Sequence, residues 1–135
     1  MVEKQHIVTA FDEDLAILND MMAKMGALAE TQLFASTEAL ITRNPSSLDD
    51  IIKRDKELDN LEAVLNDKVI EIIALRAPLA EDLRRVIVAL KVASTLERVG
   101  DLAKNIAKRN KVILSTSLKT EMLPSIKNMT SMVLK

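Results

Sequence analysis

Acidic residues four positions apart are the strongest chemical feature of this sequence. Asp55 and Asp59 form one such pair, followed closely by Glu62, and Glu97 and Asp101 form a second pair. Residues four positions apart lie on one face of a helix, so each pair can present two carboxylates to the same ligand. Carboxylate oxygens suit iron, manganese, magnesium or calcium, and they suit zinc only when nitrogen ligands join them. These five acids therefore predict a divalent metal site.

The same acids have basic neighbours, which leaves a second interpretation open. Arg54, Lys56, Arg98 and Lys104 are placed along the chain to neutralise them. Acid pairs on charged helices are often solvated or paired with nearby Lys and Arg. A network of salt bridges between helices would then take the place of the metal.

The first acid group lies in a segment predicted to form a helix from 48 to 75. Ser46 and Ser47 can cap its N-terminus, and apolar residues recur along it at three- and four-residue steps. Its acids fall within the apolar stripe rather than opposite it. A carboxylate in that position needs a cation, a hydrogen-bond donor or access to water.

The second acid pair lies in a helix predicted from 76 to 109, with Pro78 in its first turn. If this helix runs antiparallel to the preceding one, positions 59 and 97 both lie about twenty residues from the turn between them. The two acid groups are then at a similar height and could meet.

This second helix has apolar residues on two sides. One stripe comprises Val88, Val92, Leu96, Val99, Ala103 and Ile106, and the other begins with Leu83, Val86, Ile87 and Leu90 and leads to Glu97 and Asp101. A helix that is apolar on two sides is expected to contact two partners, within one bundle or between subunits.

A further helix is expected ahead of these two, from 9 to 43. Thr9 can serve as its N-cap, and Asn44 followed by Pro45 ends it because the residue before proline avoids the helical conformation. Gly26 lies inside this helix. It is either a tolerated interior glycine or the mark of a close helix contact.

The C-terminal segment begins a new helical pattern after a polar run at 115–117. Its apolar residues share one face: Met122, Ile126, Met129 and Val133. We therefore expect an all-α fold, with an antiparallel three-helix bundle over 1–114 and a connection and the start of a fourth helix over 115–135. An exposed apolar face on that fourth helix predicts self-association, with exchange of the segment between subunits.

The amino-acid composition argues against several classes of function. The chain has 19 basic and 20 acidic side chains, so direct binding to nucleic acid is not expected. It has no cysteine for disulfides or thiolate metal sites, and no apolar run long enough to span a bilayer. The acidic N-terminal stretch is unlike a signal peptide, so a cytoplasmic location is expected. The sequence also lacks a glycine-rich phosphate loop or a Ser/His/Asp set, which argues against an enzyme.

The stretch RAPLAEDLRRVIVALKVASTLERVGD resembles the signature of the PhoU family of bacterial phosphate-uptake regulators. The residues that carry this resemblance are Pro78, Ala80, Asp82, Leu83, Arg84, Lys91, Leu96, Glu97, Arg98, Gly100, Asp101 and Asn105. Segment 54–62 resembles the other acidic stretch of the family, and residues 11–15 with Met25 and Gly26 resemble its opening helix.

The resemblance implies a non-enzymatic regulator. It would link the ATPase of the phosphate ABC transporter to a phosphate-sensing histidine kinase, and it would keep phosphate-starvation genes off when phosphate is plentiful. Such a protein would reach the membrane only through its partners and would form a homo-oligomer, here taken as a homodimer. The resemblance also implies two tandem three-helix repeats, of which this chain would contain the first and the opening of the second.

The resemblance also implies which metal the acids would bind. It implies a multinuclear iron or zinc group on the acid-x-x-x-Asp motifs. Two alternatives stay open. A ferritin-like carboxylate-bridged metalloprotein would also be an acid-lined helical bundle, but it would use Glu-x-x-His pairs, and the single histidine, His6, is not part of one. A helical adaptor without metal is the other alternative.

Overall fold

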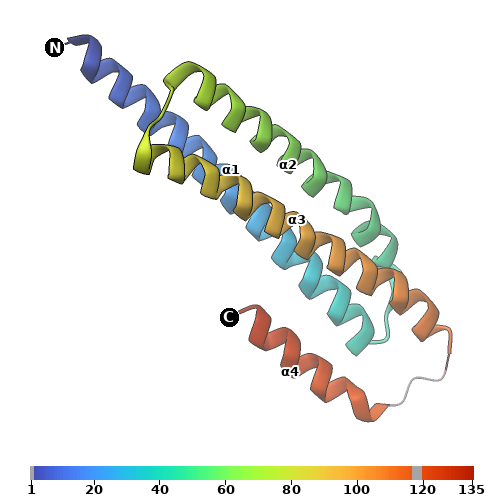
Figure 1. Cartoon of the computed structure of the whole chain (residues 1–135). Helices are drawn as coiled ribbons and strands as arrows, with labels where there is room; N and C mark the ends of the chain where they lie inside the picture. The colour runs from blue at the N-terminus through green and yellow to red at the C-terminus, as the bar shows by residue number, and fades with distance from the viewer. Residues whose placement is uncertain (1, 117–119) are drawn as a thin grey trace.

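The computed structural model describes the backbone of residues 2–116 and 120–135 and the side chains of residues 9–116 and 121–135. The described residues form four α-helices and no strand (Figure 1). These are α1 (Val2–Ile41), α2 (Leu48–Arg76), α3 (Ala80–Leu114) and α4 (Leu123–Val133), with short 3-10 turns at Pro45–Ser47 and Thr120–Met122. The expected all-α fold is confirmed.

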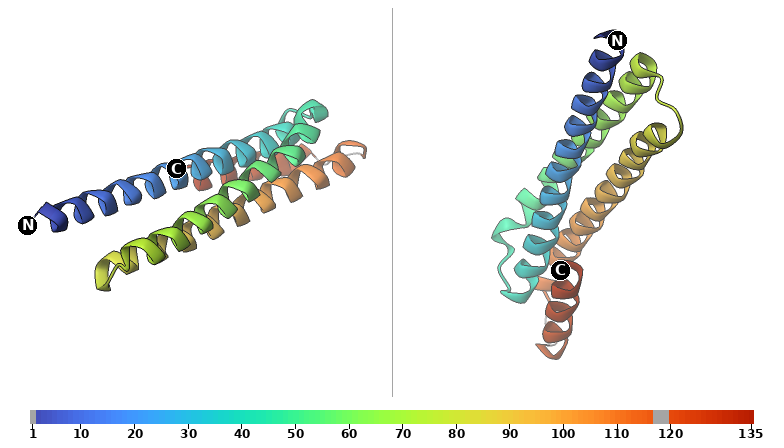
Figure 2. Two further views of the ribbon diagram at one scale, coloured as in Figure 1. Left: turned by 90° about the horizontal axis from the view of Figure 1, so that it is seen from above. Right: turned by 90° about the vertical axis from the view of Figure 1, so that its left-hand side faces the viewer.

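The first three helices form an elongated up-down-up bundle. Figures 1 and 2 show α1, α2 and α3 side by side along most of their length, with neighbours in sequence antiparallel. Each of these helices packs against both of the others, and α3 contacts α1 and α2 most extensively. Among the described helices, α4 packs against α1 alone and runs back along its C-terminal half.

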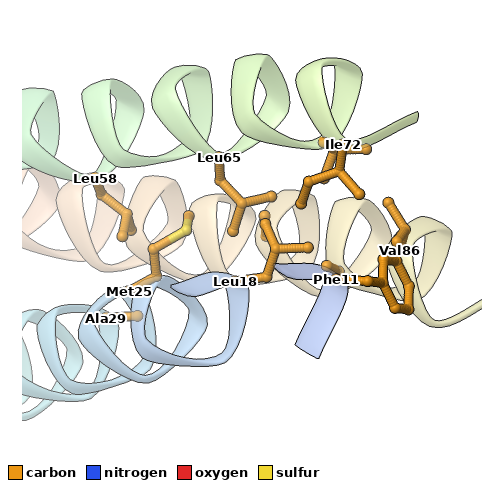
Figure 3. Packing of buried hydrophobic residues seen from close by; sticks show 11 residues of the cluster. Phe11, Leu18, Met25, Ala29, Leu58, Leu65, Ile72 and Val86 are labelled. Atoms are coloured by element: carbon orange, nitrogen blue, oxygen red, sulfur yellow. The ribbon is translucent and has the colours of Figure 1, made fainter. Parts of the chain in front are cut away.

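The core runs along the bundle axis and takes its large side chains mainly from α1 and α2. Figure 3 shows these residues converging between the helices. Fully buried members include Leu18, Met25, Leu58, Leu65, Val69, Ile72 and Val86. From α3 the buried apolar residues are, apart from Val86, small: Ala89, Ala93, Ala103 and Ala107. Small side chains let the α3 backbone approach its two neighbours closely, and this approach sets the thickness of the bundle.

Two expected features of α1 and its exit are wrong. The helix begins at Val2, seven residues before Thr9, so Thr9 is not an N-cap. Residues 2–8 contain neither glycine nor proline, and nothing there interrupts the helix. At the exit, the Asn44 side chain accepts a hydrogen bond of 3.0 Å from the backbone N–H of Ser46, and Ser47 precedes α2 without a capping side-chain bond. Asn44 therefore caps the 3-10 turn at Pro45–Ser47, and the expected serine cap of α2 is not formed.

The start of α3 also differs from expectation. Pro78 lies in the connection and α3 begins at Ala80, while α2 ends as expected, within one residue of Leu75. Ala77 follows α2 in the left-handed conformation, with φ of 43°, and its backbone N–H donates to the carbonyl of Ile73. This reversal turns the chain immediately, and the residue before proline cannot continue a helix. At its other end α3 extends to Leu114, five residues beyond the expected position 109.

Candidate functional site between α2 and α3

The antiparallel pairing of α2 and α3 brings the two acid groups together. Asp59 and Glu62 on α2 lie close enough to Glu97 and Asp101 on α3 for their charges to act on Glu97. The predicted meeting of the two acid-bearing segments is therefore seen in the structure. Their environments differ, however, because Asp55 is buried and Asp59 is exposed. The expectation that all the α2 acids share the apolar face is wrong for Asp59, since the helix turns that side toward solvent.

Lys104 connects the acids of the two helices. Its ammonium group donates hydrogen bonds to Asp55 Oδ2 on α2 and, at 2.6 Å, to Asp101 Oδ1 one turn back on α3. The whole Asp55 residue is 4% exposed, and the Lys104 side chain is 22% exposed. Hydrogen bonds to Asp101 and Asp55 raise the pKa of Lys104, and the bond from Lys104 lowers the pKa of Asp101. A permanent cation thus compensates the buried carboxylate.

Glu97 is the acid whose charge is least compensated. Burial raises its pKa, and the like charges of Asp101, Glu62 and Asp59 raise it further. The nearby Asp101 carboxylate thus acts to raise the pKa of Glu97, while the hydrogen bond from Lys104 holds the pKa of Asp101 below its usual range. The site therefore holds more negative charge than Lys104 neutralises.

The placement of the five acids shows whether their side chains surround a position for a metal ion. Within the described part of the chain, no group of three or more Asp, Glu, His or Cys side chains is placed to hold one ion. Four basic residues were considered from the sequence as partners of these acids. Lys104 forms ion pairs with two of them. Arg54, Lys56 and Arg98 form no ion pair with any carboxylate that the structure describes. The side chains as placed form an ion-pair network and not a metal cage, and the five-acid metal assignment stays a prediction.

Gln32 and Gly100 adjoin this site; the sequence did not single out Gln32, and it indicated Gly100 only as a residue of the family signature. A Cβ at Gly100 would overlap Leu58 Cδ2 and lie 3.0 Å from Gln32 Oε1, so a larger residue there would force the buried Leu58 side chain to shift. Gln32, from α1, is 2% exposed, and neither atom of its side-chain amide has a partner in the described structure. All three helices therefore meet closely beside Asp101. A glycine inside a long helical pattern was the one available signal.

The other glycine of the chain, Gly26, has no close neighbour in the described structure. Among the described atoms, nothing lies within 4 Å of a Cβ built at this position. Of its two interpretations, the structure supports the tolerated interior glycine and does not support a close helix contact.

A second ion-pair group joins α1 to α2 and was also missed. Asp14 accepts from Lys68 and from Arg76, each at 3.0 Å, although it is 8% exposed. Burial alone would raise the pKa of Asp14, but the bonds from Lys68 and Arg76 outweigh it and hold the pKa below its usual range. This group has two cations for one buried acid, so it acts as a tie between helices.

The site between α2 and α3 lies within a segment that matches a known protein family. The model of a family described as the PhoU domain matches residues 22–109, a range that includes every acid of the site and most of the three-helix bundle. The chain belongs to the PhoU domain family. The family resemblance inferred from the signature residues is confirmed.

Curated PhoU relatives agree with this assignment. The chain is 50% identical over 104 residues to a protein of Zymomonas mobilis subsp. mobilis, covering 77% of this chain and 44% of that protein. It is 35% identical over 129 residues to one of Rhizobium meliloti, covering 96% and 54%, and 33% identical over 135 residues to one of Thermotoga maritima, covering 100% and 56%. All three carry the name phosphate-specific transport system accessory protein PhoU homolog, numbered 1 for Thermotoga.

These matches also define the extent of the PhoU comparison. The chain spans about half the length of the curated relatives. In the part of the chain that the structure describes, no helix is both long and apolar enough to cross a membrane.

Proposed function

We propose that this chain serves as a regulatory accessory of phosphate uptake. The match of residues 22–109 to the PhoU domain carries the proposal, and the names of the relatives support it. In this role the protein binds the ATPase of the phosphate ABC transporter and a phosphate-sensing histidine kinase. Through that link it keeps phosphate-starvation genes off when phosphate is plentiful, without catalysing a reaction, and it acts in the cytoplasm.

A complementation experiment tests this role. A bacterial strain that lacks its own PhoU protein and carries a phosphate-starvation reporter would receive either this chain alone or a chimaera. In the chimaera, the chain replaces the matching half of the Rhizobium meliloti relative. We expect the chimaera to repress the reporter in phosphate-rich medium and to co-purify with the transporter ATPase. A well-expressed chimaera that leaves the reporter on and does not co-purify would contradict the proposal.

We also retain the metal as part of this proposal. The surplus negative charge around Glu97 is the observation that favours it, because a divalent cation would neutralise Asp101, Glu62 and Asp59 together. The metal would be iron, zinc or another divalent ion, bound singly or as a multinuclear group. For it to bind here, the Lys104 ammonium group would have to break its ion pairs with Asp55 and Asp101. The metal would supply structural cross-linking of α2 and α3.

Elemental analysis of protein purified without chelator tests the metal, and Asp101→Asn separates the two accounts of the acids. If the acids bind metal, Asp101→Asn lowers the metal content, while the melting temperature of metal-free protein stays equal or rises because one like charge is lost. If Asp101 acts as a partner of Lys104, the same change lowers that temperature. A lower temperature with unchanged metal content would reject the metal assignment.

Self-association is the remaining part of the proposal. The outer face of α4 exposes Met129, Met132 and Val133, and Met122 just before the helix is exposed as well. Ile126 is half-buried, so the expectation that it shares this exposed face is only partly met. An exposed apolar strip of this kind favours a homodimer. Light scattering over a range of concentrations should show a dimer, and Met129→Lys should weaken it; a monomer throughout would contradict the idea.

A further inference from the structure

Beyond its first turn, which carries the exposed acids Glu81 and Asp82, the exposed side of α3 carries mainly positive charge. From position 84 to position 112, all described residues, the charged residues of this helix that are exposed as whole residues are basic, while its acids Glu97 and Asp101 are partly exposed. These residues are Arg84, Arg85, Lys91, Arg98, Lys108, Arg109 and Lys111. The whole chain has a formal charge of −1, so this is a local concentration and not an overall basic character.

Four of these seven side chains belong to a regular row, which we name the basic seam. The seam comprises Arg84, Val88, Lys91, Thr95, Arg98, Leu102, Asn105 and Arg109, all of them exposed. Its members follow one another at alternating steps of four and three residues, the spacing with which one helix packs along another. The seam lies opposite the buried alanines of α3 and is about 37 Å long at 1.5 Å per residue.

The charge of the seam is available for a partner. Arg84 pairs with Glu81 at 2.9 Å, but both side chains are well exposed and a pair of this kind contributes little. No described carboxylate lies within ion-pair distance of Lys91, Arg98 or Arg109. In contrast, Lys104 on the inner side of the same helix is fully occupied by two acids. Four cations of the seam thus face solvent with little compensation.

A hollow beside the N-terminal part of the seam offers a place for an anchoring side chain. It lies between α1 and α3, has a volume of about 390 Å³, and is lined by Leu15, Leu18 and Met22 on one side and by Arg85 and Val88 on the other. Arg84 of the seam also lines it, together with its ion-pair partner Glu81. Apolar pockets bordered by charged groups are where a large apolar residue of a partner contributes most to binding.

We propose that the basic seam of α3 docks an acidic amphipathic helix of a partner protein. The partner helix places carboxylates at seven-residue spacing opposite Arg84, Lys91 and Arg98, and small apolar residues opposite Val88 and Leu102. Arginine suits this role because its planar guanidinium group can bind a carboxylate through two hydrogen bonds. One larger apolar residue of the partner enters the hollow between α1 and α3. The inference is independent of the proposed function.

A membrane surface fits the seam less well. A helix that lies on a bilayer inserts a broad apolar face next to its basic residues. The apolar face of α3 is buried in the bundle, and along the seam only Val88 and Leu102, 48% and 55% exposed, are left for lipid. The flank toward α2 also carries the partly exposed acids Glu97 and Asp101, which an anionic bilayer would repel.

Binding of synthetic peptides tests the docking surface. The probe is a 28-residue helical peptide with glutamates at every seventh position and leucine or alanine along the rest of its seam. Its control is a peptide of the same composition with the glutamates distributed around the helix. The protein variants are Lys91→Glu/Arg98→Glu in the seam and Lys53→Glu/Lys56→Glu on the exposed side of α2, which change the net charge equally. Circular dichroism verifies that both variants fold.

We expect the ordered peptide to bind at least tenfold more tightly than the control peptide, and more weakly as salt rises. The seam variant should lose at least tenfold in affinity and the α2 variant less than twofold. Equal losses in the two variants, or equal binding of the two peptides, would overturn the proposal. Anionic phosphatidylglycerol vesicles that displace the peptide would assign the seam to a membrane. Self-association that the seam variant abolishes would assign it to a second copy of this chain.

Discussion

Replacement of Lys104 by methionine tests how the acids between α2 and α3 are held. The change keeps an unbranched side chain that is one atom shorter and removes the ammonium group that Asp55 and Asp101 share. Asp55 is left as a buried carboxylate without a cation, while Asp101, whose side chain is 44% exposed, can turn to water. The loss therefore falls mainly on the Asp55 pair.

The size of the effect follows from these exposures. Removal of one partner of a fully buried ion pair destabilises a protein by about 3–5 kcal/mol. The Lys104 side chain is 22% exposed, so water reaches Asp55 when the ammonium group is gone, and we expect about 2–3 kcal/mol. The exposed Asp101 pair adds a few tenths of a kcal/mol. For a chain of this size the melting temperature should fall by about 6–15 °C.

Thermal unfolding followed by circular dichroism at pH 7, with chelator present, measures this loss. Lys108→Met is the matched control, because Lys108 is exposed one turn further along α3 and should cost less than about 0.5 kcal/mol. The double variant Lys104→Met/Asp55→Asn should recover most of the stability, since the orphan carboxylate is removed as well. A melting temperature of Lys104→Met within 2 °C of the unmodified chain, or a double variant no more stable than the single one, would refute the ion-pair account.

Four other substitutions test further features of the bundle by urea unfolding. Glu97→Gln should raise stability at pH 7 by a few tenths of a kcal/mol, and the gain should vanish below about pH 4, because the pKa of Glu97 is raised in the folded protein and its ionisation then opposes folding. Asp14→Asn should lower the free energy of unfolding at pH 7 by about 1–2 kcal/mol. The pKa of Asp14 is depressed in the folded protein, so the stabilisation by its carboxylate is present above the unfolded pKa and is lost as pH falls through the folded pKa. A loss of stability that persists unchanged at pH 2 would contradict this account. Gly100→Ala should cost about 1–3 kcal/mol because its Cβ would overlap the Leu58 side chain, whereas Gly26→Ala, in open space, should gain up to about 1 kcal/mol; equal effects of the two would refute the close approach.

The sequence by itself determined which segments form helices and at what height along them the acids lie. Apolar residues at three- and four-residue steps identify α2 and α3 whatever packs against them, because that periodicity is a property of the helix. The antiparallel meeting of Asp59 with Glu97 follows from equal distances to one tight turn. Most of the PhoU signature was readable for the same reason, since its residues from Ala80 to Asn105 lie on one helix.

The tertiary structure alone decided which side of each helix is buried and which charges pair. Val88 was assigned to an apolar stripe of α3 but is exposed, and the core contact is made by Ala89 and Ala93 one position further round. The rotation of a helix depends on how closely its neighbours approach, and periodicity does not encode that distance. Likewise, Lys104 was one of four cations near the acids, and only the packing of α3 against α2 turns its ammonium group toward Asp55, 49 residues away in sequence.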